Sequence, residues 1–329
     1  MSAVLEVDGL SVRIALPSGR FVQAVDGVSL AVEEGEIVAV VGESGCGKTM
    51  LAMSILGLLP EGGEITDGRV LLAGEDLRSA SAERLQRIRG DRIGTVFQEP
   101  MAALNPVLTV GRQVGEVLRR HTGSSGKAER RRVVELLDLV GIPDPERRFD
   151  QYPHEMSGGM AQRVVIAMAI ACGPALLLAD EPTTALDVTI QAAILRTMDQ
   201  LRRDLDMAVI LITHDLGVVA DIADRVLVMY AGRVVEEGAV ASIFTGPRHH
   251  YTRGLLASVR DPSTVRPRST LPEIPGVVPT MWGPATACTF APRCGRADET
   301  CESRLPALSS FGQGHSAACF HPGSGPVRA

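Results

Sequence analysis

The stretch IVAVVGESGCGKTMLAMSILGLL at residues 37–59 decides the fold of this chain. Its first five residues form a short apolar run rich in β-branched side chains, which is typical of a buried parallel strand. Gly42-Glu43-Ser44-Gly45-Cys46-Gly47-Lys48-Thr49 follows, and a helix-forming run then closes at Pro60. Strand, glycine loop and helix in this order predict a phosphate-binding loop.

This loop carries the groups that a nucleoside triphosphate and its metal ion need. Successive backbone N–H groups can curl around a phosphate, and the helix N-terminus adds partial positive charge. We expect Lys48 to reach the β- and γ-phosphates and the Thr49 hydroxyl to hold Mg²⁺. The chain has only two lysines, Lys48 and Lys127, among 33 basic residues. The position of one of them in this loop argues against a chance glycine turn.

Composition and charge limit the other classes of function. The chain has 329 residues, a hydrophobic content of 45% and a net charge of −6, with both signs spread along it. Nothing in this distribution indicates a nucleic-acid-binding surface. The start lacks a basic-then-apolar leader, and the longest apolar run, 164–179, is broken by Gly173-Pro174. We therefore expect a cytosolic protein that serves any membrane process from the surface.

The pattern along the chain predicts an α/β fold with an added tail. Paired strands are expected at 5–14 and 21–32, and two helices at 111–120 and 128–139 form a helical insertion. From residue 261 prolines recur up to Pro284, which indicates an extended, loop-like appendage. We place one domain at residues 1–245, with its helical subdomain at about 99–172, and a C-terminal extension at 246–329.

Two further strand ends carry candidate catalytic side chains. LLLADE at 176–181 is an apolar strand that ends in Asp180 and Glu181. In a parallel sheet these carboxylates would lie beside the phosphate loop, where Asp180 can hold Mg²⁺ and Glu181 can polarise a water. His214 follows a second apolar strand and would contact the γ-phosphate. A lone histidine at a strand end is more often structural, so its role depends on the other motifs.

Met156-Ser157-Gly158-Gly159-Met160 indicates the class. Here the chain resembles the ATP-binding-cassette superfamily, whose signature is a Ser-Gly-Gly turn that opens a helix. The other matching elements are the phosphate loop, Gln98, Asp180-Glu181, Ala185-Leu186-Asp187 and His214.

The resemblance implies an α/β fold with an ABC-type P-loop NTPase core, an antiparallel N-terminal β subdomain and a helical signature subdomain. It implies that residues 42–50, including Met50, bind ATP, and that Gln98 joins Asp180 and Thr49 at Mg²⁺. Ser157 to Met160 would contact the nucleotide held by a partner's phosphate loop, and Asp187 would lie at the dimer seam. In physical terms, residues 157–159 form a second anion site at a helix N-terminus.

Two positions depart from the superfamily pattern. Met160 replaces a common glutamine, which leaves the phosphate contacts of the signature intact. No aromatic residue stands around Ile14-Ala15-Leu16, where many members stack adenine. Phe21 could take that place.

Further motifs resemble the ATPase subunits of oligopeptide and dipeptide importers. They are Gln98-Glu99-Pro100-Met101, Leu104-Asn105-Pro106, the run from Ser157 to Arg163, and Phe290-Ala291-Pro292-Arg293-Cys294. This resemblance implies two transmembrane permease subunits, a second homologous ATPase in a heterodimer, and an extracytoplasmic peptide-binding protein. The chain would then work at the cytoplasmic face of the inner membrane, and the segment after Gln98 would receive the permease. A nickel or other small-solute importer, a soluble cassette acting on nucleic acid or ribosomes, and a homodimer are the alternatives.

Four of the six cysteines cluster in the tail. Cys288, Cys294, Cys301 and Cys319 have the spacing C-x5-C-x6-C-x17-C. Four thiolates can hold Zn²⁺ or an iron–sulfur cluster, and free thiols are the third option. The importer resemblance implies a 4Fe–4S cluster, which would staple a proline-rich tail with little apolar content.

The remaining two cysteines lead to separate predictions. We expect Cys172 to lie in the core. Cys46 stands at a helix N-terminus, which should lower the pKa of its thiol, so that alkylation would block ATP hydrolysis unless ATP is bound.

Overall fold

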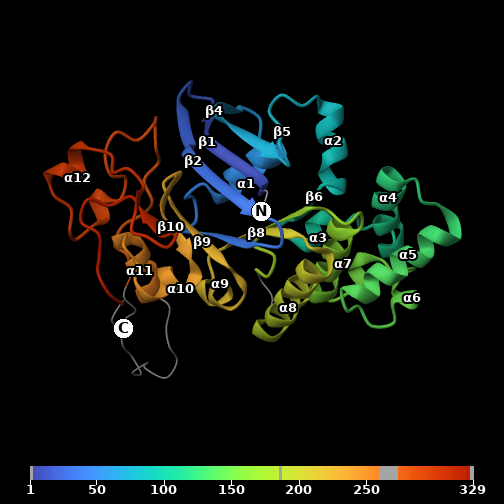
Figure 1. Cartoon of the computed structure of the whole chain (residues 1–329). Coiled ribbons are helices and arrows are strands. Elements are labelled where there is room, and N and C mark those ends of the chain that lie inside the picture. Colours follow the sequence, from blue (N-terminus) through green and yellow to red (C-terminus); the bar gives the residue numbers. More distant parts are fainter. Residues whose placement is uncertain (1–2, 185–186, 259–272, 327–329) are drawn as a thin grey trace. The chain divides into compact units, whose positions relative to one another are not determined.

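The computed structural model describes residues 3–184, 187–258 and 273–326 (Figure 1). These residues form two compact units. The first contains 79–211 with the short segments 3–5 and 32–36, and the second contains 6–31, 37–78 and 212–326. The division at residue 245 into an ATP-binding domain and an extension stays a prediction.

The sequence predicts an antiparallel N-terminal subdomain. The sheet that corresponds to it has four strands, and most of it belongs to the second unit. Its order is β2 (Phe21–Glu33), β1 (Ala3–Ala15), β4 (Gly63–Leu72) and β5 (Glu75–Asp76). The hairpin between β1 and β2 closes where the Leu16 N–H donates to the Arg20 carbonyl at 2.8 Å. Gly19 takes a positive φ of 78° in this turn, which explains the glycine.

A second run of strands in this unit ends at the strand that directly precedes the phosphate loop. The order is β11 (Ser309–Ser310), β12 (Ser316–Ala317), β10 (Arg233–Ala239), β9 (Arg225–Tyr230) and β3 (Ile37–Val41). β3 is parallel to β9, and β10 pairs antiparallel with both β9 and β12. In the pair of β9 and β10, Arg233 lies opposite Tyr230 and Ala239 lies opposite Arg225. The sequence did not predict that two short strands of the tail extend this run.

The second unit has five described α-helices. They are α1 (Lys48–Leu56), α9 (Leu216–Ile222), α10 (Val240–Thr245), α11 (His250–Ser258) and α12 (Glu299–Ser303). Of these, α9 and α10 pack on strands β3, β9 and β10. The helix predicted to reach Leu59 ends earlier because Gly57 adopts φ 62° and donates to the Ser54 carbonyl at 3.1 Å.

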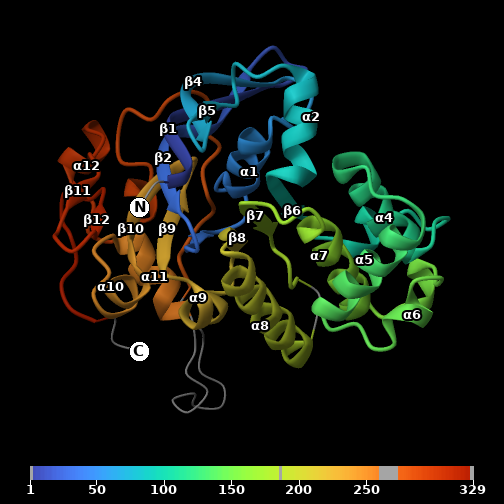
Figure 2. The same ribbon diagram turned by 45° about the vertical axis from the view of Figure 1, so that its right-hand side comes forward.

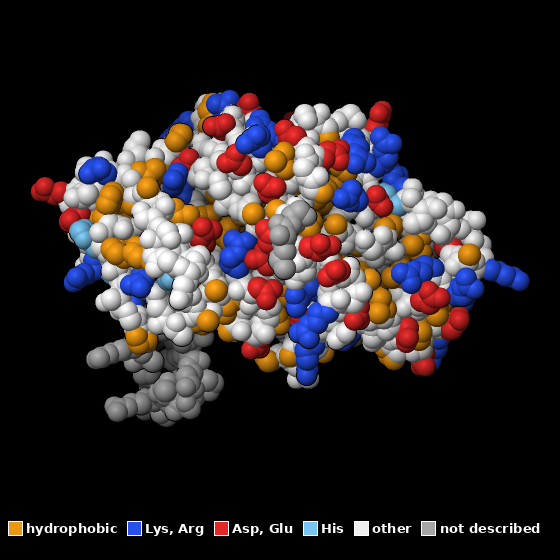
Figure 3. All heavy atoms as spheres, in the orientation of Figure 1, with side chains coloured by type: hydrophobic (Ala, Val, Ile, Leu, Met, Phe, Trp, Pro, Cys, Tyr) orange, Lys and Arg blue, Asp and Glu red, His pale blue; other side chains and the backbone are white. Residues whose placement is uncertain are grey.

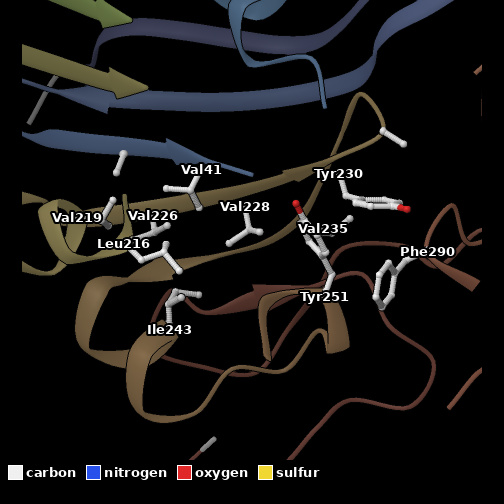
Figure 4. Packing of buried hydrophobic residues seen from close by; sticks show 12 residues of the cluster. Val41, Leu216, Val219, Val226, Val228, Tyr230, Val235, Ile243, Tyr251 and Phe290 are labelled. Carbon is white, nitrogen blue, oxygen red and sulfur yellow. The ribbon is translucent and has the colours of Figure 1, made fainter. Parts of the chain in front are cut away.

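Three aromatic rings join the tail to the core of the second unit (Figure 4). Tyr230 on β9, Tyr251 on α11 and Phe290 in the tail have ring centroids 4.7–5.5 Å apart. All three side chains are buried. The tail therefore has an apolar anchor in addition to any staple, because Phe290 packs against the core of the second unit.

The first unit contains the other parallel strands. Their order is β8 (Ala208–Thr213), β7 (Leu176–Asp180) and β6 (Ile93–Val96), with β8 ending beyond the limit of this unit. β6 and β7 pair in parallel with Ile93 opposite Leu176. Every residue of β7 is buried, which explains its unbroken apolar sequence.

The first unit has a helical layer, as the predicted fold requires, and the bounds of the helical subdomain at about 99–172 stay a prediction. Between α2 (Ala82–Asp91) and α8 (Val188–Leu205) the described residues form the 3-10 helix η1 (Pro153–Glu155) and five α-helices: α3 (Pro100–Ala103), α4 (Val110–Thr122), α5 (Gly126–Leu139), α6 (Pro145–Arg148) and α7 (Gly158–Ile170). α4, α5 and α7 lie side by side in both views (Figure 1 and Figure 2). Gly111 on α4 has no room for a side chain, because a Cβ there would lie 2.3 Å from the Phe149 ring.

Two further expectations from the sequence concern membrane-spanning helices and the burial of Cys172. No helix in the described part of the chain is long and apolar enough to cross a membrane. Cys172, which we expected in the core, is only half-buried, because it stands just past the end of α7.

Replacing Phe290 tests the aromatic anchor of the tail. We expect Phe290→Ala to lower the free energy of unfolding of the second unit by about 3 kcal/mol, because a buried phenyl ring leaves a cavity. Chemical denaturation combined with limited proteolysis of the tail measures this. Phe311→Ala is the matched control: this ring is 37% exposed, and the loss should stay under about 1 kcal/mol. Equal effects of the two variants would contradict the anchor.

Candidate functional site

Gly42 and Gly47 are the two glycines of the phosphate loop at which neighbouring backbone leaves no room for a side chain. A Cβ on Gly42 would lie 2.3 Å from the Met229 carbonyl oxygen, and a Cβ on Gly47 would lie 2.4 Å from the Ala24 carbonyl oxygen. The loop is thus pressed against neighbouring backbone between the fully buried strand β3 and helix α1. Its residues Ser44, Gly45 and Thr49 are exposed, with Met50 half-buried. The loop therefore presents an accessible face.

Lys48 is buried at the base of the loop, with a relative exposure of 6%. Its ammonium donates to the carbonyl oxygens of Gly42 at 2.8 Å and Glu43 at 3.1 Å. Within the described residues no carboxylate forms an ion pair with it. The ammonium also lies 3.7 Å from Cys46 Sγ. A buried positive charge that has only carbonyl and thiol partners is costly, and an anion bound at the loop would compensate it. This arrangement is suited to a phosphate ligand.

Glu43 is held by residues that sequence reasoning missed. Its backbone N–H donates to the Tyr251 hydroxyl at 2.7 Å, and its carboxylate forms an ion pair with Arg293 at 2.6 Å. Arg293 lies 250 residues along the chain, within a tail motif that the sequence analysis noted for other reasons. No local pattern relates these positions.

Cys46 contradicts the expectation of a reactive thiol. Its side chain is fully buried, and burial raises the pKa of the thiol, although Lys48 nearby acts in the opposite direction. Desolvation of the thiolate therefore outweighs the helix N-terminus and the lysine. The predicted sensitivity of this position to alkylation loses its basis.

Gln98 and Glu181 come together in the first unit. The Gln98 side-chain amide donates to Glu181 Oε2 at 3.2 Å, and the Thr184 hydroxyl donates to the same oxygen at 2.8 Å. Asp180 is buried at the end of β7 and directly precedes Glu181 in the sequence. Thr184 was not predicted, because nothing in the sequence separates it from neighbouring threonines.

The backbone of Glu181 is itself unusual, with a positive φ of 49°. Non-glycine residues take this conformation rarely, and such strain is common at functional sites. This backbone conformation turns the chain sharply just after the end of β7.

His214 lies in the second unit, exposed at the end of β8. The neighbouring Asp215 caps α9 by accepting from the Gly217 N–H at 2.9 Å. The local chain thus fixes the position of the histidine backbone. Its contact with a γ-phosphate stays a prediction.

The signature turn forms the exposed start of α7. Ser157 caps this helix by accepting from the Met160 N–H at 3.3 Å, and both Ser157 and Gly158 are exposed. Gly159 is buried, and a Cβ there would lie 2.7 Å from the Ile190 side chain on α8. Asp187 in turn caps α8 by accepting from the Ile190 N–H at 3.0 Å. Ala185 and Leu186, predicted with Asp187, lie outside the described residues.

The four tail cysteines line one pocket, together with the buried ring of Phe290. Cys301 is buried, and Cys288, Cys294 and Cys319 are half-buried. Burial, and then the other three thiols, raise the pKa of Cys319 to about 11. The sequence prediction that these cysteines gather is supported by this shared pocket.

A second group of potential ligands overlaps this pocket. Side-chain atoms of Asp298, Cys301 and His321 lie within 4.8 Å of one another. Asp298 already caps α12, accepting from the Cys301 N–H at 3.0 Å, and its other oxygen lies 2.8 Å from His321 Nε2. A structural role explains this group.

Comparisons with known proteins agree with these motifs. The ABC transporter family model matches residues 25–184, and the model "Oligopeptide/dipeptide transporter, C-terminal region" matches residues 235–301. The "Probable peptide ABC transporter ATP-binding protein" of Sinorhizobium fredii is 51% identical over 299 residues, which are 91% of this chain and 89% of that protein. The chain belongs to the ATP-binding proteins of ABC transporters.

Other ABC transporter ATP-binding proteins are similar over almost the whole chain. The dipeptide transport ATP-binding protein DppD of Bacillus subtilis is 50% identical, covering 97% of this chain and 95% of that protein. DppD of Escherichia coli is 45% identical and covers 97% of both. The predicted resemblance to peptide-importer ATPases is thereby confirmed.

Solved structures support the cassette fold. The dimeric structure of MJ0796, a bacterial ABC transporter cassette, matches with a TM-score of 0.64 at 30% identity, over 72% of this chain and 98% of that one. A post-hydrolysis state of the same cassette, bound to ADP and Pi, matches equally well.

Proposed function

We propose that this ABC transporter ATPase hydrolyses ATP to drive the import of peptides through a membrane permease. The observation that carries this is the buried Lys48 in an exposed phosphate loop, in a chain whose residues 235–301 match the oligopeptide/dipeptide transporter C-terminal region. Relatives that are 45–51% identical are named as peptide or dipeptide transport proteins. Their cargo supports di- or oligopeptides as the cargo here.

ATP is held by the loop residues. The backbone N–H groups of 42–49 surround the phosphates, Lys48 contacts the β- and γ-phosphates, and Met50 continues the site along α1. Thr49, Gln98 and Asp180 would hold Mg²⁺, because their side chains carry the hard oxygen ligands that this ion takes. Mg²⁺ supplies charge neutralisation on the phosphates when it is bound.

Glu181 is the general base of hydrolysis. The carboxylate would take a proton from the attacking water, and the contacts from Gln98 and Thr184 fix its orientation. His214 would donate a hydrogen bond to the γ-phosphate and so respond to its loss. Orientation of a base before the reaction is the way in which a protein lowers the barrier for in-line attack.

The signature turn completes a nucleotide site in a partner ATPase. Ser157, Gly158, Gly159 and Met160 begin an α7 of 13 residues, so exposed N–H groups and the helix dipole can contact a γ-phosphate. Asp187 stands at the seam, next to Val188, which is 81% exposed. We infer a second, homologous ATPase in a heterodimer.

The permease partners are two transmembrane subunits, with a peptide-binding protein on the far side of the membrane. The docking segment is the one after Gln98, where Met101 is 47% and Val107 is 74% exposed. Exposed apolar side chains of this kind mark contact surfaces. The chain would then act at the cytoplasmic face of the inner membrane. On the face shown in Figure 3 acidic and basic side chains are intermixed.

The cysteine pocket is proposed to hold a 4Fe–4S cluster. The donor set fits, because four thiols line one pocket and such clusters take four cysteine ligands. Cys288, Cys294, Cys301 and Cys319 would hold it. Zn²⁺ on the same thiols is the alternative. A structural role follows from the position of the pocket in the tail, beside Phe290.

Substitution of Glu181 tests the proposed function in the assembled transporter. In vesicles with permease and peptide-binding protein, wild-type ATP hydrolysis should rise with peptide and accompany uptake. Glu181→Gln should bind ATP yet lose at least about a hundredfold in hydrolysis, because the base is gone. Glu146→Gln, an exposed carboxylate on α6, should hydrolyse normally. Normal hydrolysis by Glu181→Gln, or no response to peptides, would contradict the proposal.

Metal analysis tests the cysteine pocket. Protein purified without oxygen should contain about four iron and four sulfide per chain, with a broad visible absorption that Cys288→Ser removes. Cys172→Ser is the matched control and should keep the iron. Zinc in place of iron would refute the cluster and support the alternative, and metal-free protein of unchanged stability would refute both.

A further inference from the structure

Two side chains from the C-terminal region contact the phosphate loop at a single residue, Glu43. The hydroxyl of Tyr251 accepts the Glu43 N–H at 2.7 Å, and the guanidinium of Arg293 pairs with the Glu43 carboxylate. The Glu43 carbonyl accepts from Lys48. One loop residue is thus fixed at its amide, its carbonyl and its side chain, and two of the three contacts come from far along the chain.

The contact with Arg293 is bidentate. Nη1 lies 2.6 Å from Oε2 and Nη2 lies 3.0 Å from Oε1, so both carboxylate oxygens are used. Paired donors of this kind add geometric precision as well as strength. The Arg293 side chain is only 5% exposed, so water screens the pair weakly.

Arg293 is itself fixed by the backbone of the tail. Its Nε donates to the Pro275 carbonyl at 2.7 Å, and its Nη2 donates to the Ile274 carbonyl at 3.1 Å. It directly precedes Cys294, which lines the cysteine pocket. The guanidinium therefore connects an ordered part of the tail to the phosphate loop.

The negative charge of Glu43 makes its contact with Arg293 relevant to the binding of ATP. A carboxylate within a loop that binds a polyphosphate repels the ligand, and at the reduced dielectric of a partly buried site this repulsion is substantial. The guanidinium of Arg293 neutralises the negative charge of the Glu43 carboxylate, and the same contact orients the loop. Glu43 is 30% exposed, so the loop side of the pair remains near solvent where the ligand enters.

We propose that Arg293 is a positioning residue of the ATP site, through which the C-terminal extension neutralises Glu43 and holds the phosphate loop ready for nucleotide. This proposal rests on the proposed binding of ATP by residues 42–50. By linkage, nucleotide binding and order in the segment around Arg293 support each other. The extension is then part of the nucleotide site in addition to any role of its cysteines.

Calorimetric titration of the full chain with a non-hydrolysable imido analogue of ATP and Mg²⁺ tests this. Arg293→Ala should weaken binding about tenfold, within the usual range of coupling between sites. Adding Glu43→Gln to it should restore affinity to within about threefold of wild type, because the unpaired negative charge disappears. Arg69→Ala is the matched control: its pair with Asp8 is exposed, at 64% and 62%, and affinity should change less than about twofold.

The outcomes separate the explanations. If Arg293→Ala binds like wild type, or if the double variant binds as weakly as the single one, the proposed charge pairing is wrong. Absence of binding by the wild-type chain would instead overturn the ATP site itself. Arg293→Lys keeps the charge and is the safer variant for folding. It should weaken binding about threefold and speed hydrogen exchange of residues 42–49, and an unchanged affinity with unchanged exchange would also overturn the proposal.

Discussion

The buried ammonium of Lys48 is the constraint on which the rest of this structure depends. It donates hydrogen bonds to two carbonyl oxygens of the phosphate loop. The folded chain therefore carries a buried positive charge that a bound anion would compensate. Holding it there requires a strand buried on both faces before the loop and a helix after it. It also requires glycine at two places where backbone approaches too closely for any side chain. The strand, the glycine loop and the helix together hold the ammonium of Lys48 in its buried position.

The C-terminal extension shares the core that supports this loop. Tyr251 contributes its ring to the aromatic cluster and its hydroxyl to the Glu43 amide. Phe290 packs in the same cluster and also borders the cysteine pocket. Core packing, thiol pocket and loop contacts are thus made by neighbouring residues of one segment. A change in any of them is expected to reach the nucleotide loop through short, direct contacts.

Sequence alone was sufficient where function depends on local order along the chain. Strand, glycine loop and helix around Lys48, the acidic strand end at Glu181, and the Ser157 helix cap each follow from short-range rules, and the structure has them. It failed where the outcome depends on distant contacts. The pKa of Cys46 is set by how completely its surroundings bury it, which no nearby residue reveals. Arg293 contacts Glu43 although 250 residues separate them in the sequence. Thr184 contacts Glu181 at a turn where Glu181 has a positive φ.

The central claim is that the phosphate groups, rather than the base, are what the loop around Lys48 recognises. Titration of the full chain with ATP, ADP and AMP in the presence of Mg²⁺ tests it most directly. The account predicts measurable binding of ATP and ADP and an affinity for AMP that is lower by about a hundredfold or more, because AMP lacks the phosphates that Lys48 contacts. Equal affinity for AMP and ATP would contradict it.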